Sequence, residues 1–514
     1  MGLTELFSNI ANAIRYGTGS SAKITANDFP HQITNMVNTH TNAFVSMFNG
    51  NITNINSSTW NAINNTKLAP YAFYNYTKLT GSPVAGNNVT DMSYMYYNCQ
   101  NLTGSPVCCN NATVMVNTYY NCRNLTGSPV FPSNTQYGNM ESAYHGCRNL
   151  TGSPVCPSGT FYGSMRFAYT NCYNLTGSPV FPSSLYGDAD FAYTNCYNLT
   201  GSPVFPSSYG PSTIYGTYAN CYNLTGAPVV PSYCTEMNGV YQSCINLTGS
   251  PVCGNLTAMN SLYRNCQNLT GSPVCSNKVI YMDYTYSNCQ NLTGSPVCGS
   301  NVKFMTYTYI NCINLTGSPV CGSNVSDMSN AYINCINLTG SPVCGSNVVY
   351  MKGAYKNCYN LTGSPVIGSN VVYVDDAYKD CHNLTGPVRL NSTKTCYMNN
   401  TFANCYNLTG PIVLNSTNIK YMNNTFANCY NIAGNVYIYS HNVGYMYNCF
   451  YGRNTSKMLN IYVPLNGSIT TKTFDAAHSA FKLTYDGSSW YNAALNIYVY
   501  QRSNIAQNQA NNGD

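Results

Sequence analysis

Charged residues are scarce in this chain of 514 residues. Asp, Glu, Lys and Arg together make up 7% of it, against about 25% in a typical soluble protein. The 21 Lys and Arg residues exceed the 15 Asp and Glu residues by a net charge of +6, and they form no basic run. Proteins that bind nucleic acids usually concentrate their basic residues to contact the phosphates. We therefore expect no nucleic-acid partner.

Long apolar runs and catalytic groupings are also missing. No stretch of about 18 apolar residues occurs, so no membrane insertion is expected. The first residues contain no apolar core of signal-peptide length, which favours folding in a cytosol. The acidic residues are dispersed, and neither a repeated Ser/His/Asp or Cys/His grouping nor a Gly-rich phosphate loop is found. These absences predict a protein that is not an enzyme and uses no cofactor.

What the chain does contain is a repeat of roughly 23 residues. The string NLTGSPV recurs with few changes between Asn101 and Val366, and a cysteine lies two residues before the asparagine of each copy. These cysteines indicate about 16 repeats of a solenoid, in which each repeat buries its apolar side chains against its neighbours. The repeat cysteines are Cys99, Cys122, Cys147, Cys172, Cys196, Cys221, Cys244, Cys266, Cys289, Cys312, Cys335, Cys358, Cys381, Cys405, Cys429 and Cys449.

Comparison of the copies separates fixed from variable positions. With the repeat cysteine as position 0, an aromatic residue such as Tyr96 or Tyr119 lies at position −3, and a leucine such as Leu102 or Leu125 lies at +3. Positions −7, −4, −3 and 0 share one face of a short helix. The proline at +7 removes an N–H donor, so only short strands are expected. We predict an α/β solenoid of leucine-rich-repeat type with short strands, short helical turns and atypical end caps.

The 26 cysteines suggest disulfides or a metal site, but their spacing favours neither. Neighbouring repeats would hold the position 0 side chains about 4.8 Å apart and parallel, whereas a disulfide needs Cβ atoms about 3.8 Å apart that face each other. No C-x-x-C pair occurs, and the six His are scattered, so zinc-site spacing is absent. We predict buried free thiols and leave some disulfides or a metal as alternatives. The predicted core thiols include Cys99, Cys122, Cys147 and Cys172.

The asparagine at position +2 has two interpretations. Asn101, Asn124 and their equivalents lie in N-L-T sequons, which accept glycans in secreted proteins. The alternative is a buried ladder, in which each side-chain amide bonds backbone groups of its own repeat and the next. The missing signal peptide favours the ladder and places these asparagines in the core. The asparagine at position −1, such as Asn98, is expected to be the left-handed residue that ends the helical turn.

The two ends differ from the repeat region. Residues 1–45 are predicted to form two helices, the second capped by Asp28, and to act as an N-terminal attachment segment. Residues 46–449 are the predicted solenoid, whose first repeats are degenerate. Residues 450–514 contain the runs LNIYVPL and LNIYVYQ, which predict a β-rich cap.

Two stretches resemble known families. The pattern Ala-Tyr-x-x-Cys-x-x-Leu-Thr over about residues 70–450 resembles the BspA-like leucine-rich repeat of bacterial surface antigens, but GSP stands where that repeat usually has alternating Ile. The opening FSNIANAIRYGTGSSAKITANDFPHQI resembles the short N-terminal module of minor structural proteins in tailed bacteriophages. The first resemblance implies adhesion or receptor binding without catalytic residues. The second implies attachment to a virus particle.

These features predict a non-enzymatic virion protein of a tailed phage, made in the host cytoplasm and located in a fibre, tail or head. Its N-terminal segment would bind other virion proteins, and its solenoid would bind a host surface glycan or protein. Assembly into a homo-oligomer is a further alternative. The alternative is a bacterial cell-surface adhesin.

The variable positions +1 and −2 are the candidate recognition surface, because exposed tyrosine offers contact area and a hydroxyl group. The competing interpretation is that these residues only solvate the solenoid or pack against identical neighbours. The candidates at +1 are Gln100, Arg123, Arg148, Tyr173, Tyr197, Tyr222, Gln267, Gln290 and His382.

Overall fold

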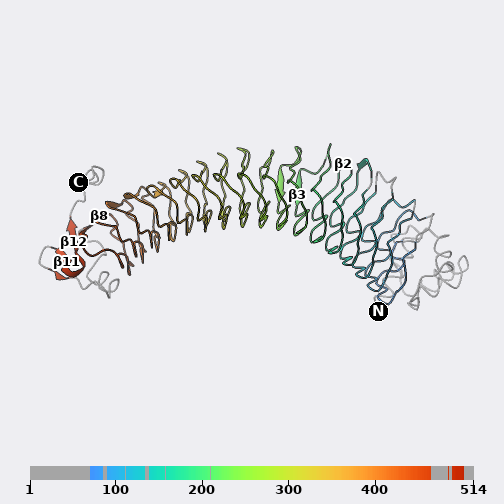
Figure 1. The fold of residues 1–514 in the computed structure, drawn as a ribbon, viewed down its shortest axis with the longest axis horizontal. Coiled ribbons are helices and arrows are strands. Elements are labelled where there is room, and N and C mark those ends of the chain that lie inside the picture. The colour runs from blue at the N-terminus through green and yellow to red at the C-terminus, as the bar shows by residue number, and fades with distance from the viewer. Residues whose placement is uncertain are drawn as a thin grey trace, which may run out of the picture. The chain divides into compact units, whose positions relative to one another are not determined.

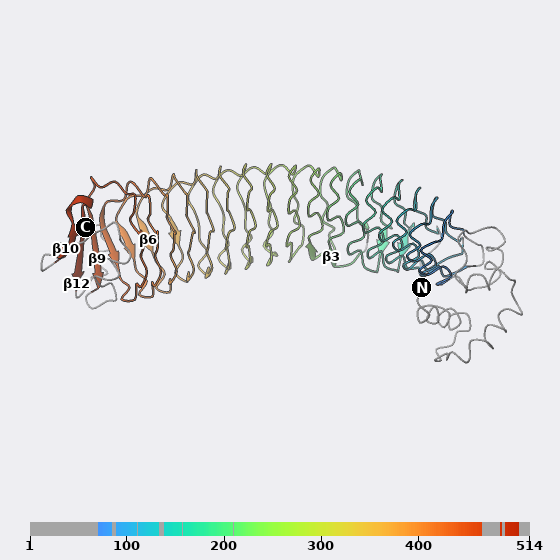
Figure 2. The ribbon, with the colours of Figure 1, turned by 90° about the horizontal axis from the view of Figure 1, so that it is seen from below.

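The protein was analysed as a computed structural model that describes residues 70–84, 89–109, 111–132, 138–156, 158–208, 210–464, 484–485 and 489–502. The predicted helices of residues 1–45 lie outside these ranges. The chain divides into two compact units, unit 1 (Met1–Thr248) and unit 2 (Gly249–Asp514). In each unit the described backbone winds into successive stacked repeats, which form a β-solenoid (Figures 1 and 2). The structure supports about 13 turns with repeats of ~24 residues.

The segments predicted to be short helical turns are series of β-turns instead. The amides of Tyr97 and Cys99 donate to carbonyl groups three residues earlier, whereas those of Tyr96 and Asn98 donate to the next repeat at 2.9 and 2.7 Å. An α-helix would use every amide within the segment, so alternating donation to the neighbouring repeat replaces it. The prediction of helical turns is therefore wrong. The described residues contain no α-helix and one short 3-10 helix, η1 (Ala493–Leu495).

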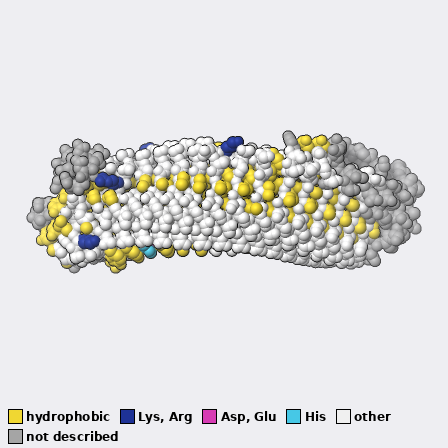
Figure 3. Space-filling view, turned by 45° about the horizontal axis from the view of Figure 1, so that its top comes forward, with side chains coloured by type: hydrophobic (Ala, Val, Ile, Leu, Met, Phe, Trp, Pro, Cys, Tyr) yellow, Lys and Arg dark blue, Asp and Glu magenta, His cyan; other side chains and the backbone are white. Residues whose placement is uncertain are grey.

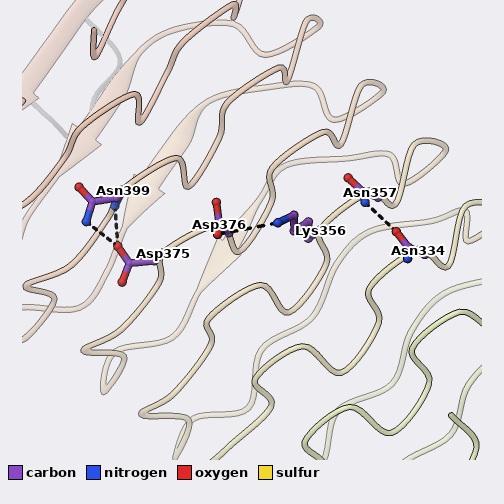
Figure 4. Close-up of polar contacts among 6 residues, drawn as sticks. All are labelled: Asn334, Lys356, Asn357, Asp375, Asp376 and Asn399. Atoms are coloured by element: carbon purple, nitrogen blue, oxygen red, sulfur yellow. Dashed lines mark hydrogen bonds and ion pairs between the residues drawn. The ribbon is translucent and has the colours of Figure 1, made fainter. Parts of the chain in front are cut away.

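Left-handed residues at positions −5 and −1 make this series of turns possible. Tyr94 and Asn98 have φ values of 57° and 60°, and the predicted left-handed conformation at position −1 is confirmed. Asparagine tolerates this conformation better than most residues. Its side chain then reaches the preceding repeat, as Nδ2 of Asn357 does when it donates to Oδ1 of Asn334 at 2.6 Å (Figure 4). We call this row of position −1 side chains the asparagine ladder.

The core consists of the side chains at positions −7, −3, 0 and +3. Tyr96, Tyr119, Leu102 and Leu125 are completely buried, as are the cysteines at position 0. The rings at position −3 stack from repeat to repeat: those of Tyr96 and Tyr119 lie 5.3 Å apart and 4° from parallel. Each such pair contributes about 0.5–1.5 kcal/mol beyond its buried area. Because no repeat can form these stacks alone, the repeats stabilise one another.

The buried thiols satisfy their hydrogen-bonding groups within the core. Sγ of Cys122 donates to the carbonyl oxygen of Tyr96, and Sγ of Cys147 donates to that of Tyr119, each at 3.0 Å. Burial raises the pKa of the Cys122 thiol well above its usual range. All 26 cysteines are free in the structure; 20 are buried and six are partly exposed.

A tyrosine hydroxyl compensates for the backbone hydrogen bonds that the proline repeats lack. The Tyr286 hydroxyl accepts from the amide of Val274 at 3.2 Å and donates to the carbonyl oxygen of the same valine at 2.6 Å. The same bracket recurs along the proline repeats, as between Tyr119 and Val107. The backbone after each proline is therefore held by a side chain from the following repeat.

Regular strands at this position begin with β5 (Val366–Ile367), in the last GSP repeat, and continue where the sequence changes to GP. Strands β6 (Val388–Leu390) and β7 (Ile412–Leu414) pair in parallel. In the repeats that follow β6 and β7 the position −3 residues are Phe402 and Phe426, which have no hydroxyl group. Val366 of β5 has both supports, since the Tyr378 hydroxyl brackets it and it also pairs with β6, whereas β6 and β7 rely on strand pairing without a hydroxyl.

The remaining strands are short. In unit 1, β1 (Thr160–Phe161) pairs with β2 (Ser184–Leu185), and β3 (Thr213–Tyr215) pairs with β4 (Glu236–Asn238). In unit 2 one sheet has the order β10-β11-β12-β9-β8-β7-β6-β5. Its other members are β5 (Val366–Ile367), β8 (Gly434–Ile438), β9 (Leu459–Pro464), β10 (Thr484–Tyr485), β11 (Ser489–Asn492) and β12 (Ile497–Arg502).

The last strands belong to the segment for which a β-rich cap is predicted. Strand β12 pairs in parallel with β9, and β10 and β11 then continue the sheet in antiparallel pairs. Arg453 connects two parts of this segment: its guanidinium donates to the carbonyl oxygens of Lys457 at 2.6 Å and Asn496 at 3.0 Å. Burial lowers the pKa of Arg453 to about 10.

Candidate recognition surface

The nine candidate residues at position +1 all reach the surface of the described structure. Arg123, Arg148, Tyr222 and Gln290 are exposed, and the other five are partly exposed. Gln100 and Arg123 bend back to the asparagine ladder, where each donates to the position −1 asparagine two residues before it at 2.7 Å. These two side chains therefore support the repeat as well as covering it.

Three of the candidate tyrosines form a continuous stack in unit 1. The rings of Tyr173 and Tyr197 lie 4.8 Å apart, those of Tyr197 and Tyr222 lie 4.9 Å apart, and both pairs are within 7° of parallel. The guanidinium of Arg148 lies over the Tyr173 ring at 5.5 Å. These residues do pack against identical neighbours, so the ring faces inside the stack are covered. Ring edges and hydroxyl groups remain for a partner.

A second stack at position +1 lies in unit 2. The ring of His382 lies 4.8 Å from that of Tyr359 and 4.6 Å from that of Tyr406, which in turn lies 5.3 Å from Tyr430. Of this stack only His382 is among the predicted candidates, although the three tyrosines occupy the same position of the repeat. Gln267 and Gln290 lie at position +1 in repeats without an aromatic residue there.

The structure reveals an aromatic row that the sequence analysis missed. Four tyrosines at position −8 and Tyr445, their structural equivalent in the last repeat, stack with ring centroids 5.2, 5.0, 5.1 and 5.0 Å apart. Parallel β-bridges connect their backbones from repeat to repeat. The signal was present as a tyrosine directly before the buried residue at position −7. We call this row the outer tyrosine ladder; its members are Tyr350, Tyr373, Tyr397, Tyr421 and Tyr445.

Asn101 and Asn124, which we predicted to be in the core, are exposed. Leu102 turns inward at position +3, so its neighbour at +2 points outward. Nδ2 of Asn101 still donates to the preceding repeat, to the carbonyl oxygen of Thr77 at 2.8 Å. A ladder therefore exists at this position, but it lies at the surface. The remaining predicted core residues, Cys99, Cys122, Cys147, Cys172, Tyr96, Tyr119, Leu102 and Leu125, are buried.

The surface around these stacks carries little charge. The face in Figure 3 shows lines of hydrophobic side chains among mostly uncharged ones. Among the described residues there is one ion pair, between Lys356 and Asp376 at 4.0 Å (Figure 4). No cluster of three or more His, Cys, Asp or Glu in this part of the chain could hold a metal ion. No helix in the described ranges has the length and apolarity to cross a membrane.

The stacked repeats with buried leucine, tyrosine and cysteine define a leucine-rich-repeat β-solenoid. The chain matches the family model of the BspA type leucine rich repeat region over residues 20–126, 164–293 and 348–480. These segments cover more than half of the chain, and the protein belongs to this family, whose members are typically non-catalytic. The family resemblance predicted from the repeat pattern is confirmed.

The other comparisons add no functional information. Comparison with curated proteins finds no match. Among solved structures, the crystal structure of a TLR13–ssRNA13 complex matches at 12% identity and a TM-score of 0.22, over 71% of this chain and 58% of that chain. The chain therefore spans less than two thirds of that receptor's length.

Proposed function

We propose that the protein is a non-enzymatic recognition protein of a tailed-phage virion, in a fibre or associated with the tail or head, and that its solenoid binds a host surface glycan or protein. The observation that carries the proposal is the set of aromatic stacks at position +1. They place rows of tyrosine edges and hydroxyl groups on a backbone that is fixed by repeat-to-repeat hydrogen bonds. Tyrosines held in this way lose little conformational freedom on binding.

The proposed attachment to the particle rests on residues 1–45, whose sequence resembles the N-terminal module of phage structural proteins. We test it with a chain that lacks these residues. The shortened protein should fold, because contacts in a solenoid are local. It should bind host cells but fail to enter particles. Normal incorporation of the shortened protein would refute this part of the proposal.

Receptor binding is tested separately with Tyr173→Ser, Tyr197→Ser and Tyr222→Ser combined. Loss of host-cell binding by this variant, with the solenoid still folded, is the expected result. The control replaces Gln267 and Gln290 by Ser, since these residues occupy position +1 without an aromatic stack. Equal binding by the wild type and the tyrosine variant would exclude this stack as the receptor site.

A bacterial cell-surface adhesin is the second candidate function. The BspA-type repeat supports it directly, since this family takes its name from bacterial surface antigens. The two proposals differ in where the protein is found. Purified phage particles containing the chain support the first, and surface labelling on uninfected bacteria supports the second.

We further propose that the solenoid has sixteen stacked repeats. This count rests on the sixteen repeat cysteines, all of which are buried. The last of them, Cys449, lies at position −4 of its repeat, because Phe450 stacks on Phe426 and Arg453 takes position 0. Removal of one 23-residue repeat from a regular stretch should shorten the particle-bound solenoid by about 4.8 Å. Electron microscopy of chains lacking several repeats would measure this step.

A further inference from the structure

We propose that the outer tyrosine ladder binds a neutral, extended, β-linked polysaccharide, with the sugar chain running along the ladder and about one sugar facing each repeat. This site is separate from the position +1 stacks to which the proposed function assigns the receptor. It does not depend on a place in a virion.

The first argument is the regular spacing of hydroxyl groups. The ring centroids from Tyr350 to Tyr445 are 5.0–5.2 Å apart at every step. Exposure is substantial for Tyr350 (46%), Tyr373 (36%) and Tyr445 (57%), and the other two members are partly exposed. None of the five hydroxyls makes a hydrogen bond within the described residues. They form a row of donors and acceptors that is open to a ligand.

The second argument is the length of this step compared with the repeat of candidate ligands. In an extended peptide, side chains on one face recur every ~6.6–6.8 Å, so a bound strand would lose register with the ladder after two or three residues. Each sugar of an extended β-linked polysaccharide advances by close to one solenoid step. Such a chain can therefore present equivalent hydroxyl groups to successive tyrosines along the whole row.

The third argument is that the ring faces are covered. Neighbouring rings in the ladder lie 4–11° from parallel, so each inner ring is enclosed by its neighbours. Single-stranded nucleic acids bind by stacking bases on open aromatic faces and by contacts of basic residues with phosphates. The ladder offers ring edges and hydroxyl groups instead. These suit a ligand that is rich in hydroxyl groups.

The fourth argument is the chemistry beside the ladder. Val374 is completely buried, so Tyr373 and Asp375 on either side of it point outward together. One oxygen of Asp375 accepts from the backbone and side-chain nitrogens of Asn399, both at 2.9 Å (Figure 4). The other carboxylate oxygen makes no hydrogen bond within the described residues. A carboxylate beside a row of phenol hydroxyls is a suitable acceptor for sugar hydroxyl groups.

The charges near the row do not favour an ionic polymer. Lys352 and Lys420 are exposed there, and Asp375 opposes them. Asp327 occupies the equivalent position before Tyr350 and ends the row at that side. The ladder thus has a defined length of five rings and little net charge, which favours a neutral chain over a phosphate or uronic acid polymer.

The test measures the binding of cello-oligosaccharides and chito-oligosaccharides of two to eight sugars to the full chain by calorimetry. Affinity should increase with each added sugar up to about five and then level off, with little dependence on salt. The combined variant Tyr373→Phe, Tyr397→Phe and Tyr421→Phe keeps the ring stack and removes three hydroxyls. It should bind at least tenfold more weakly.

The matched control changes a stacked tyrosine pair of the same unit that belongs neither to the outer tyrosine ladder nor to position +1, with Tyr284→Phe and Tyr307→Phe, whose rings lie 4.8 Å apart. Its oligosaccharide affinity should equal that of the wild type. Absence of binding to both sugar series, affinity that does not depend on length, or an equal loss in both variants would overturn the proposal. Tighter binding of a single-stranded oligothymidine than of any sugar would overturn it as well. Host-cell binding that persists in the ladder variant leaves the proposed receptor function intact, so the two failures are distinguishable.

Discussion

The tyrosine bracket of the proline repeats gives a direct prediction for Tyr286→Phe. The substitution keeps the ring stacks on Tyr263 and Tyr309, at 5.6 and 5.5 Å, and removes the hydroxyl that accepts from and donates to Val274. Each hydrogen bond contributes about 0.5–1.5 kcal/mol net, so the two together are worth about 1–3 kcal/mol. Val274 is 36% exposed, so water can replace part of this loss, and we expect a value near 1 kcal/mol.

The reverse substitution can be made at Phe402, which occupies position −3, where most repeats have tyrosine. There the backbone that a hydroxyl would bracket is already paired in strands β6 and β7. Phe402 is completely buried, so Phe402→Tyr would bury a hydroxyl without a partner and should destabilise the protein by about 1–3 kcal/mol. The two substitutions therefore act in the same direction although they are chemically opposite.

Amide hydrogen exchange is the appropriate assay, because repeat arrays need not unfold in a single step. Peptides that contain Val274 should lose protection from exchange in Tyr286→Phe, while the protection of peptides from unit 1 should not change. Urea denaturation gives the overall free energy. If the amide hydrogen exchange of Val274 is unchanged and Phe402→Tyr stabilises the protein, the reasoning is refuted. The tyrosine hydroxyl would then not hold the backbone of the GSP repeats, and strand pairing would not replace it in β6 and β7.

Three further predictions concern thiols, pH and glycine. In the native protein the six partly exposed thiols should react with a bulky thiol reagent before the 20 buried ones. Reaction of all 26 thiols should require denaturant. Rapid reaction of all thiols in the native protein would contradict the burial of the repeat cysteines. Burial raises the pKa of Cys312 from 9.0 to about 12, and it also raises the pKa values of Cys289 and Cys335. Their neutral forms stabilise the fold below about pH 9, so the urea midpoint should fall as pH rises above 9 and stay level between about pH 7 and 8. Gly340 has φ +78°, and an added Cβ would lie against Oγ and 3.0 Å from Cβ of Ser318, whereas Gly434 has φ +81° and nothing near. Gly340→Ala should therefore lower the thermal midpoint more than Gly434→Ala, and equal shifts would show that only backbone strain matters.

The repeat and its core could be predicted because each buried position recurs many times in one chain. Comparison of copies is enough to show that Tyr96, Leu102 and Cys99 lie inside. The local backbone could not be predicted in the same way. A spacing of three and four residues suits a helix, but it also suits β-turns with left-handed residues at Tyr94 and Asn98. The choice depends on where alternate amides find their partners, and those partners lie about 23 residues away.

The surface was harder to predict for a related reason. Position +1 was chosen as the candidate surface because its residue type varies between repeats. A variable residue was assumed not to pack against its neighbours. Tyr173 and Tyr197 show that a variable position can still stack on its equivalent in the next repeat. The outer tyrosine ladder was missed because it lies beside the buried position −7. Asn101 was misplaced because an invariant residue was taken to be a buried one.

The asparagine ladder has a direction, and that direction limits how the chain can change. Each Nδ2 donates to the oxygen of the repeat before it, as Asn334 donates to Asn311 at 2.6 Å. Asp380 accepts from Asn404 in the same way but has no amide hydrogen to pass on. Whole copies can be duplicated or deleted by unequal recombination between Asn265 and Asn357, because every junction in that stretch joins an asparagine donor to an asparagine acceptor. The length of the array is therefore free to drift between related genes, while the aspartate marks a boundary that such exchanges should seldom cross.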